Sequence, residues 1–288
     1  MDYFERMQRR LDGKEPFVPG FLGAKNRVRQ IADLMGVRTP RILKSGSIAQ
    51  LMDGDLPNEF VLKPSFASTS LGVRLLRKTR DGFRDLVTGD DHSREEIIGS
   101  ANEINTRYFG EGEGGDFFIE ELLLDRQGNF PPDDIRVYSF QGEVGMVLME
   151  QHLSSPAKAM YFDGDFLPFP DVHLRYGVAD NQEHLEEIVE AKTPEHWREI
   201  LNVARRISCA MPTAFCRVDL YDTPNGVYLG EITFYPGTFI TRTRKIMSQS
   251  EAERLGRIWG DAEDRLSGSL ELKYGSQIRD VVRTDSSK

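Results

Sequence analysis

Residues 215–234 read FCRVDLYDTPNGVYLGEITF, and this stretch predicts a β-hairpin. Apolar and polar side chains alternate on both sides of Pro224-Asn225-Gly226, which is typical of two paired strands. We expect a three-residue loop, because proline favours the start of a type I turn and Gly226 accepts the left-handed conformation that must follow. A two-residue Asn225-Gly226 loop is the alternative, and it would shift the pairing of the strands.

The three-residue loop determines which side chains meet across the hairpin. Counting outwards from the loop places Asp219 opposite Glu231 and Arg217 opposite Thr233, all on one face of the sheet. Two carboxylates that oppose each other on a sheet repel unless a positive charge lies between them. A divalent cation such as Mg²⁺ binds carboxylate oxygens, so the hairpin predicts a metal site. A solvated face with ordinary charges is the simpler alternative.

The bulk composition is that of a globular chain large enough for one large domain or two small ones. Hydrophobic residues make up 39% of the 288 positions and charged residues 29%. The net charge of -9 argues against general nucleic-acid binding. No apolar run reaches the roughly 20 residues that span a membrane. The charged first residues do not resemble a secretory signal, and two cysteines without metal-ligand spacing favour a cytoplasmic protein.

The remaining periodicity predicts helices and strands without a regular βαβ alternation, which favours the α+β class. Helices are expected over residues 26–35, 90–108, 194–211 and 250–266. Strands are expected over residues 60–64, 73–77, 117–124, 135–140 and 144–149. Residues 153–182 are rich in proline, aspartate and aromatic residues but lack periodicity, so we expect a long loop or an irregular insertion there.

Two segments outside the hairpin carry groups suited to a bound anion. Lys63 ends the apolar strand 60–64, and a lysine in such a run either reaches for solvent or serves an anion. The loop that follows, residues 65–72 (SFASTSLG), has few bulky side chains, so its amides and hydroxyls can approach phosphate oxygens. A flexible hairpin tip is the common alternative, and the chain contains no GxxxxGK[ST] loop.

The two strands after this loop add further polar groups. Glu120-Glu121-Leu122-Leu123 ends an apolar strand and leaves backbone groups for the edge of a base. Asp134 and Arg136 lie two positions apart on one strand face. A carboxylate there suits ribose hydroxyls, and an arginine suits a phosphate or carboxylate. A salt bridge within the sheet is the alternative for this pair.

The order of these segments resembles the ATP-grasp superfamily and is similar to its TupA-like branch, named for a protein of teichuronopeptide synthesis. The resemblance covers about residues 20–245. It rests on Lys25, VLKPS (61–65), the serine-rich loop, IEELL (119–123), DIRVYSF (134–140), RVDLY (217–221) and GEITFYPG (230–237). No single motif is decisive, whereas their order and spacing together are specific.

The resemblance implies an α+β fold in which two lobes hold ATP between them, with Mg²⁺. It divides the chain into an N-terminal helical segment (1–45), a lid lobe (46–119) and a C-terminal lobe (120–288) that contains the 153–182 insertion. The implied catalytic residues are Arg217, Lys63 and Arg136. The implied nucleotide contacts are Lys25, Lys63, Ser68, Thr69, Ser70, Glu120, Glu121, Leu122, Leu123 and Asp134. The implied metal ligands are Asp219, Glu231 and Thr233.

Two features depart from the family pattern. Thr233 stands where many ATP-grasp ligases have asparagine, so the metal is expected to keep more water. The usual N-terminal substrate domain is reduced, so the C-terminal lobe and residues 153–182 are expected to bind the substrate.

The activity that the resemblance implies is carboxylate–amine ligation through an acyl phosphate. The expected partners are a small-molecule carboxylate, such as an amino acid, sugar acid or secondary-metabolite precursor, and an amine, with no nucleic acid or membrane involved. A homodimer is the default assembly. A kinase that phosphorylates a hydroxyl is the first alternative, because both reactions share the nucleotide half of the site. A nucleotide-binding protein without catalysis is the second.

Overall fold

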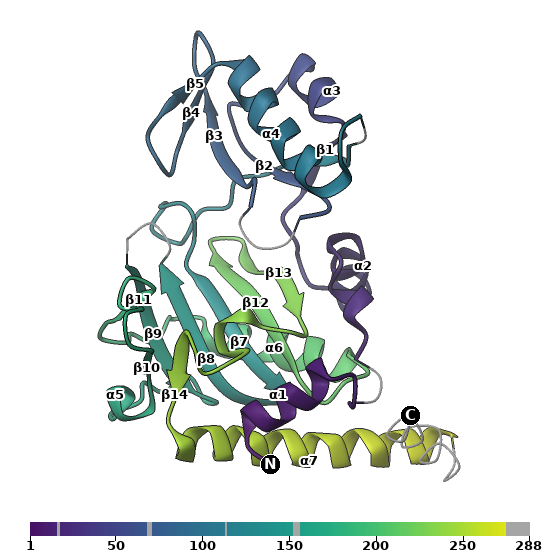
Figure 1. Cartoon of the computed structure of the whole chain (residues 1–288), viewed down its shortest axis with the longest axis vertical. Helices are drawn as coiled ribbons and strands as arrows, with labels where there is room; N and C mark the ends of the chain where they lie inside the picture. The colour runs from purple at the N-terminus through teal and green to yellow at the C-terminus, as the bar shows by residue number, and fades with distance from the viewer. Residues whose placement is uncertain (16–17, 68–70, 113, 152–155, 275–288) are drawn as a thin grey trace. The chain divides into compact units, whose positions relative to one another are not determined.

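The computed structural model describes residues 1–15, 18–67, 71–112, 114–151 and 156–274. The chain folds into two compact units (Figure 1). The larger unit consists of residues 1–39 and 132–288, and the smaller unit of residues 40–131. These borders differ from the lobe borders expected at 45 and 119, because the strand that begins at Ile42 pairs with the strand that ends at Glu120.

The smaller unit is an antiparallel sheet packed against two helices. The sheet order is β1-β6-β2-β3-β4-β5. Its elements are β1 (Ile42–Gly46), α3 (Ile48–Asp53), β2 (Glu59–Pro64), β3 (Arg74–Lys78), β4 (Phe83–Asp85), β5 (Asp91–His92), α4 (Arg94–Phe109) and β6 (Phe117–Glu120). Ser47 and Ser93 begin the two helices with capping boxes, which satisfy the free amides of the first turn. The second cap starts α4 later than expected, after β5.

The larger unit is built on a six-stranded sheet of order β11-β9-β8-β7-β12-β13, beside a two-stranded sheet of β10 and β14. Its strands are β7 (Asp134–Phe140), β8 (Glu143–Gln151), β9 (Ala157–Asp163), β10 (Tyr176–Val178), β11 (Glu186–Ile188), β12 (Cys216–Thr223), β13 (Gly226–Thr233) and β14 (Lys245–Met247). Its helices are α1 (Tyr3–Leu11), η1 (Gly20–Gly23), α2 (Lys25–Met35), α5 (Val172–Arg175), α6 (Trp197–Ala210), η2 (Gly237–Phe239) and α7 (Gln249–Tyr274). These elements confirm the α+β class.

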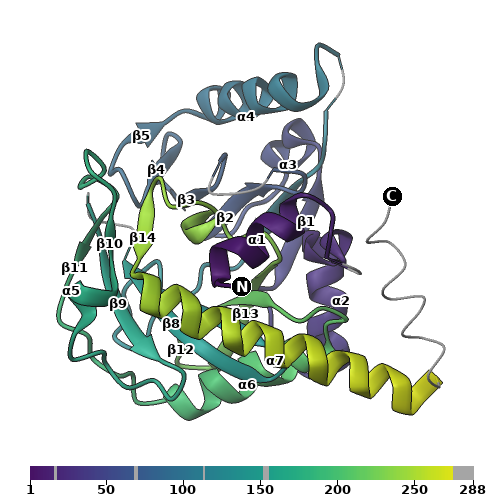
Figure 2. The same cartoon turned by 60° about the horizontal axis from the view of Figure 1, so that its bottom comes forward.

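Alternate residues of this sheet build two separate cores, because side chains alternate between the faces of a strand. On one face Ile135 and Val137 pack with the apolar residues of α2 and α6. On the other face Tyr138 and Phe140 pack with α1 and α7. Figures 1 and 2 show α1 beside α7. The face that carries α1 and α7 is also the face of Arg136, two residues before Tyr138.

The hairpin of β12 and β13 has a shorter loop than expected. Thr223 pairs with Gly226, so the loop consists of Pro224 and Asn225 alone, and the expectation of three loop residues was wrong. Gly226 has the expected positive φ, at 103°. The Thr223 hydroxyl fastens the turn by donating to the Gly226 carbonyl at 2.8 Å.

A β-bulge restores the expected pairing of the acids. Gly230 is the additional residue, because Leu229 pairs with Leu220 while Glu231 pairs with Asp219. A Cβ atom at Gly230 would lie 2.7 Å from the Tyr221 ring, so this position accepts only glycine without rearrangement. The bulge adds the residue that the loop lacks, and the predicted opposition of the two carboxylates is therefore confirmed.

Residues 153–182 are more regular than expected. Residues 152–155 are not among the described residues, but β9, α5 and β10 follow them. β9 is an interior strand whose residues 159–162 are all buried. A strand that is buried on both faces shows no alternation, which is why its period was missed.

The helix expected over residues 194–211 is α6, which begins only at Trp197. The Thr193 hydroxyl donates to the Phe166 carbonyl instead of capping the helix.

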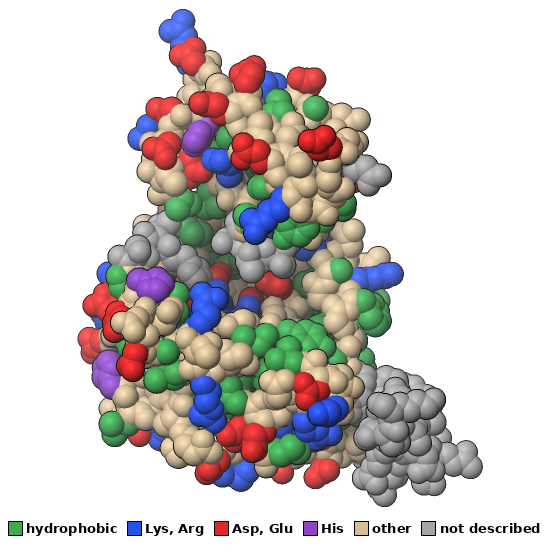
Figure 3. Space-filling view, viewed as in Figure 1, with side chains coloured by type: hydrophobic (Ala, Val, Ile, Leu, Met, Phe, Trp, Pro, Cys, Tyr) green, Lys and Arg blue, Asp and Glu red, His purple; other side chains and the backbone are tan. Residues whose placement is uncertain are grey.

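Charged side chains of both signs are interspersed on the surface shown in Figure 3. Within the described part of the chain, no helix is both long enough and apolar enough to cross a membrane.

Candidate active site

The candidate site lies on the sheet face that α1 and α7 partly cover. Three neighbouring strands place Arg136, Asp219 and Glu231 in one row, because Asp219 pairs with Arg136 on one side and with Glu231 on the other. The next row pairs Arg217 with Tyr138 and with Thr233 in the same way. Side chains opposed on antiparallel strands project to the same side, so charged groups from all three strands share one face.

Arg217 and Asp219 form a buried, two-pronged ion pair. The Arg217 guanidinium donates to both Asp219 oxygens, from Nε at 2.7 Å and from Nη2 at 2.6 Å. Each residue is only 7% exposed. Burial disfavours the charge on Arg217, yet the charge and hydrogen bonds of Asp219 outweigh it and raise the pKa of Arg217. Arg217 also lies 3.5 Å from the hydroxyls of Thr233 and Thr238.

The negative charge of Glu231 is not fully neutralised by the positive groups around it. Loss of surrounding water and then the charge of Asp219 raise its pKa, while Arg217, a hydrogen bond from Thr233 and Lys25 oppose the change. Glu231 keeps exposed surface, so repulsion between the two carboxylates is the contribution on which we place most weight. A cation bound at this point would relieve that repulsion.

Lys25 approaches Glu231 through the N-terminal end of α2. It is the first residue of that helix, directly after η1. The η1 segment lies against β13, since a Cβ atom at Gly23 would be 3.0 Å from the Ile232 carbonyl oxygen. The charge of Lys25 lowers the pKa of Glu231. Two residues separated by about two hundred positions in the sequence are thus brought together.

The metal hypothesis agrees with the donor set. Among the described residues, no group of three or more His, Cys, Asp or Glu side chains could hold a metal ion by itself. Mg²⁺ usually takes one or two carboxylates, with waters and substrate phosphates completing its shell. Asp219 and Glu231 supply two carboxylates, so they fit Mg²⁺ that arrives with a nucleotide and do not form a cage of protein ligands alone.

Asp134 and Arg136 form the salt bridge that the sequence left open as an alternative. Arg136 Nη2 lies 3.2 Å from Asp134 Oδ2, and Nη1 pairs with Glu150. The ribose role of Asp134 and the catalytic role of Arg136 therefore remain predictions. The charge of Asp134 is also the largest cause that raises the pKa of Tyr221 on the neighbouring strand.

Sequence reasoning missed Lys245, which joins this network from β14. Its Nζ lies 2.5 Å from Glu150 and 2.7 Å from Glu186, and Lys245 is 7% exposed. Burial lowers the pKa of Lys245, and Glu186 opposes that change. The signal that singled out Lys63, a lysine beside an apolar run, is also present in Lys245-Ile246-Met247.

In the smaller unit, Lys63 is held by Glu120. The two side chains form an ion pair of 2.6 Å, with Glu120 2% and Lys63 21% exposed. Glu121 is fixed by Arg41, whose backbone amide donates to the Glu121 carboxylate at 2.8 Å. Leu122 and Leu123 follow the end of β6, outside the strand. The expected lid residues Ser68, Thr69 and Ser70 lie outside the described residues.

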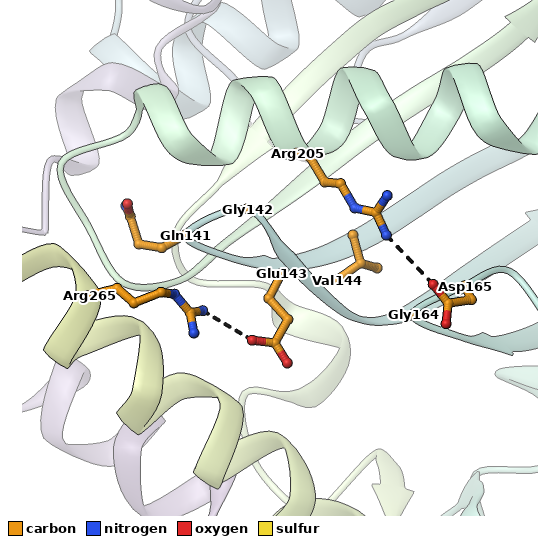
Figure 4. A pocket seen from close by; sticks show the side chains of 8 residues that line it. All are labelled: Gln141, Gly142, Glu143, Val144, Gly164, Asp165, Arg205 and Arg265. Carbon is orange, nitrogen blue, oxygen red and sulfur yellow. Dashed lines mark ion pairs between the residues drawn. The ribbon is translucent and has the colours of Figure 1, made fainter.

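A cavity of about 440 Å³ lies elsewhere in the larger unit (Figure 4). Arg205 and Arg265 enter it, and each forms an ion pair with an acid that also lines it, Asp165 at 3.7 Å and Glu143 at 3.2 Å. The cavity lies at the β7–β8 turn, five residues or about 17 Å along β7 from Arg136. It is therefore separate from the row of Asp219 and Glu231, which contains the chemistry.

The chain belongs to the TupA-like ATP-grasp family, whose model matches residues 20–256. Ligation that depends on ATP and Mg²⁺ is typical of this family.

Solved structures similar to this chain are distant. D-alanine–D-alanine ligase from Bacillus anthracis is 16% identical with a TM-score of 0.47, over 91% of this chain and 69% of that one. The ATP-grasp ligase PsnB, complexed with a precursor variant, Mg and ADP, is 12% identical with a TM-score of 0.42, over 85% of this chain and 58% of that one. L-amino acid ligase from Bacillus licheniformis is 17% identical with a TM-score of 0.39, over 75% and 41%. No curated protein matches the chain.

Proposed function

We propose that this protein is an ATP-dependent ligase that joins a small-molecule carboxylate to an amine through an acyl phosphate. The observation that carries the proposal is the opposition of Asp219 and Glu231, with Arg217 and Lys25 beside them. Phosphoryl transfer needs neutralised charge and in-line placement more than a covalent protein nucleophile. These four side chains supply what that chemistry requires.

The proposed reaction has two steps. A substrate carboxylate oxygen attacks the γ-phosphorus of ATP, the bond to the β-phosphate oxygen breaks, and ADP leaves. The amine nitrogen then attacks the acyl carbon, phosphate leaves, and the amine proton passes to solvent. Arg217 is proposed to stabilise the charge on the acyl phosphate. Its own bond to Asp219 fixes the orientation of the guanidinium.

Asp219 and Glu231 are the residues that would hold Mg²⁺, with Thr233 as the third proposed ligand. When bound, the metal supplies neutralisation of the phosphate charge. The hydroxyl of Thr233 already contacts Arg217 at 3.5 Å and hydrogen-bonds Glu231. We therefore assign Thr233 a smaller share of the binding than the two acids.

The remaining roles concern the nucleotide. Lys25 and Lys63 are proposed to bind its phosphates, and residues 120–123 its adenine. The backbone of Leu122 and Leu123 lies beyond the end of β6, which leaves it available to a base edge. Lys63 would have to exchange its partner Glu120 for phosphate oxygens. Asp134 is proposed for the ribose, Arg136 for the reacting groups, and residues 68–70 for the lid.

Substrate identity is proposed only at the level of class, as an amino acid or sugar acid with an amine, in the cytoplasm. The test is trapping with hydroxylamine, which converts an acyl phosphate to a hydroxamate. We expect hydroxamate and ADP from the full chain with Mg·ATP and a library of carboxylates. A stable phosphate ester without hydroxamate would support the kinase alternative instead. If no substrate mixture leads to consumption of ATP, the result would support a nucleotide-binding protein without catalysis.

A further inference from the structure

Arg10, in α1, is a fully buried arginine of the larger unit, and the reaction above does not use it. Its side chain has no exposed surface. Nη1 donates to the carbonyls of Phe215 at 3.1 Å and Phe234 at 2.7 Å. Nε and Nη2 donate to the Glu15 carboxylate at 2.6 and 2.7 Å, and Nη2 also to the Thr213 hydroxyl at 3.1 Å.

The two carbonyls belong to the open end of the hairpin that holds the acids. Phe215 directly precedes β12, and Phe234 directly follows β13. A single nitrogen of Arg10 thus ties both strands together at the end opposite the turn. Asp219 lies four residues after Phe215, and Glu231 lies three residues before Phe234. Strand ends fray unless their backbone groups are satisfied, so this tie limits how far the two strands can separate.

The neighbouring helices hold Arg10 at this point. α1 and α7 pack closely, because a Cβ atom at Gly256 of α7 would collide with the Met1 carbonyl oxygen. The guanidinium carbon of Arg10 lies 4.6 Å from the centre of the Trp259 ring. Residues 1–15 lie outside the part of the chain matched by the family model, as does most of α7. We call the contact of Arg10 with the Phe215 and Phe234 carbonyls the clamp. Arg10, and most of the helix α7 that packs against α1, therefore lie in segments that the family model does not match.

We propose that Arg10 is a positioning residue, which sets the spacing of Asp219 and Glu231 through the carbonyls of Phe215 and Phe234. The inference rests on the proposed function, since it treats the two acids as the metal site. A buried ion pair contributes little net stability compared with apolar packing, so stability alone is a weak reason for Arg10 and Glu15 to be buried here. Holding the hairpin ends is a more specific reason.

The experiment compares Arg10→Met with Arg6→Met in the full chain. Arg6 is the matched control, because it lies on the same helix and pairs with Glu263 of α7 at 2.7 Å. Two quantities are measured: amide hydrogen exchange along β12 and β13, and the Mg²⁺ concentration that half-saturates thermal stabilisation by ADP. In Arg10→Met we expect faster exchange at the outer ends of both strands and about a tenfold higher Mg²⁺ requirement. Arg6→Met should change neither quantity, whatever its loss in Tm.

Conservative variants keep the test decisive if Arg10→Met does not fold. Arg10→Lys retains one donor nitrogen and the positive charge, and we expect exchange and Mg²⁺ requirement between those of wild type and Arg10→Met. Glu15→Gln leaves the guanidinium but weakens its orientation, and should give a smaller change of the same kind. Equal Mg²⁺ requirement and equal exchange in wild type and all foldable Arg10 and Glu15 variants would overturn the inference. Wild-type protein that shows no Mg²⁺·ADP stabilisation would count against the proposed function, while the exchange data would still test the clamp.

Discussion

Replacing Glu231 with glutamine separates a functional acid from a structural one. The substitution keeps the shape of the side chain and removes the charge opposed to Asp219. It leaves the buried Arg217–Asp219 pair intact, whereas a change at Asp219 would strand the arginine. A structural acid should lose stability when neutralised. If the acid is instead a metal ligand opposed to a like charge, neutralising it should make the protein more stable and less active.

The expected gain follows from the geometry of the sheet. Like charges directly opposed on neighbouring strands cost about 0.2–1 kcal/mol, and we take about 0.5 kcal/mol because Glu231 keeps exposed surface. For a unit of this size, 1 kcal/mol shifts Tm by roughly 2–4 °C. Glu231→Gln should therefore raise Tm in metal-free buffer by about 1–2 °C.

The gain has a defined pH dependence. The pKa of Glu231 is raised in the folded protein, by loss of water and by the opposed charge of Asp219. A raised carboxyl pKa means that the folded state binds the proton more tightly than the unfolded state. Wild-type stability therefore falls as pH rises from the ordinary value near 4.3 through the raised one. The advantage of the variant should be present at neutral pH and absent below about pH 4.

The same variant should lose the function. Only two carboxylates stand at the row, and no third acid of the described residues forms a metal-binding group with them. We expect Mg²⁺-dependent turnover to fall by about 100-fold or more, equivalent to about 2.7 kcal/mol in the barrier. Scanning calorimetry in chelator measures the change in Tm, and release of ADP from Mg·ATP measures turnover. Glu187→Gln is the control, because Glu187 is an exposed glutamate on β11, the other edge strand of the sheet.

Near wild-type turnover in Glu231→Gln, or a Tm loss of several degrees at neutral pH, would refute this reasoning. The first result would mean that the acid is not a metal ligand. The second would mean that its charge stabilises the fold.

Two further substitutions test other parts of the account. Lys63→Met should weaken ATP binding about tenfold or more and also destabilise the protein, because the ion pair with the buried Glu120 is lost. Unchanged nucleotide affinity in titration calorimetry would contradict the phosphate role. Gly230→Ala should lower Tm and turnover together, because its Cβ would press on the Tyr221 ring at 2.7 Å. Gly237→Ala is the matched control, since its Cβ would meet nothing within 4 Å, and equal effects of the two alanines would argue against the bulge.

The candidate metal pair could be predicted because the pairing of two strands depends on short-range counting. The predicted pairing of Asp219 with Glu231 is right, although the loop length from which it was counted is wrong. The loop is one residue shorter than assumed, and the bulge at Gly230 adds that residue back. Glycine has no side chain to disturb the apolar–polar alternation, so a bulge at this position leaves no trace in the pattern. The alternation of the strands identified their faces but not their loop.

The contacts that the sequence did not predict join distant segments. Lys245 reaches Glu150 and Glu186 from the separate two-stranded sheet, and Arg10 reaches carbonyls about two hundred residues away. Charged residues in amphipathic segments are usually solvated, so Arg10 attracts no notice before the fold is known, and Lys245 is marked only by the short apolar run Ile246-Met247. β9 was missed for the opposite reason, since burial on both faces removes the period that reveals a strand. Local pattern predicted part of the elements, whereas tertiary structure determined which charges are buried.

The most direct test of the central claim is binding of Mn²⁺, as a substitute for Mg²⁺, in the presence of a non-hydrolysable ATP analogue. Electron paramagnetic resonance measures the free ion during titration of wild type, Asp219→Asn and Glu231→Gln. The account predicts that wild type with the analogue binds one or more ions that the analogue alone does not hold as tightly, and that each variant loses this additional affinity. Equal Mn²⁺ affinity in wild type and both variants would contradict the assignment of the opposed carboxylates to the metal.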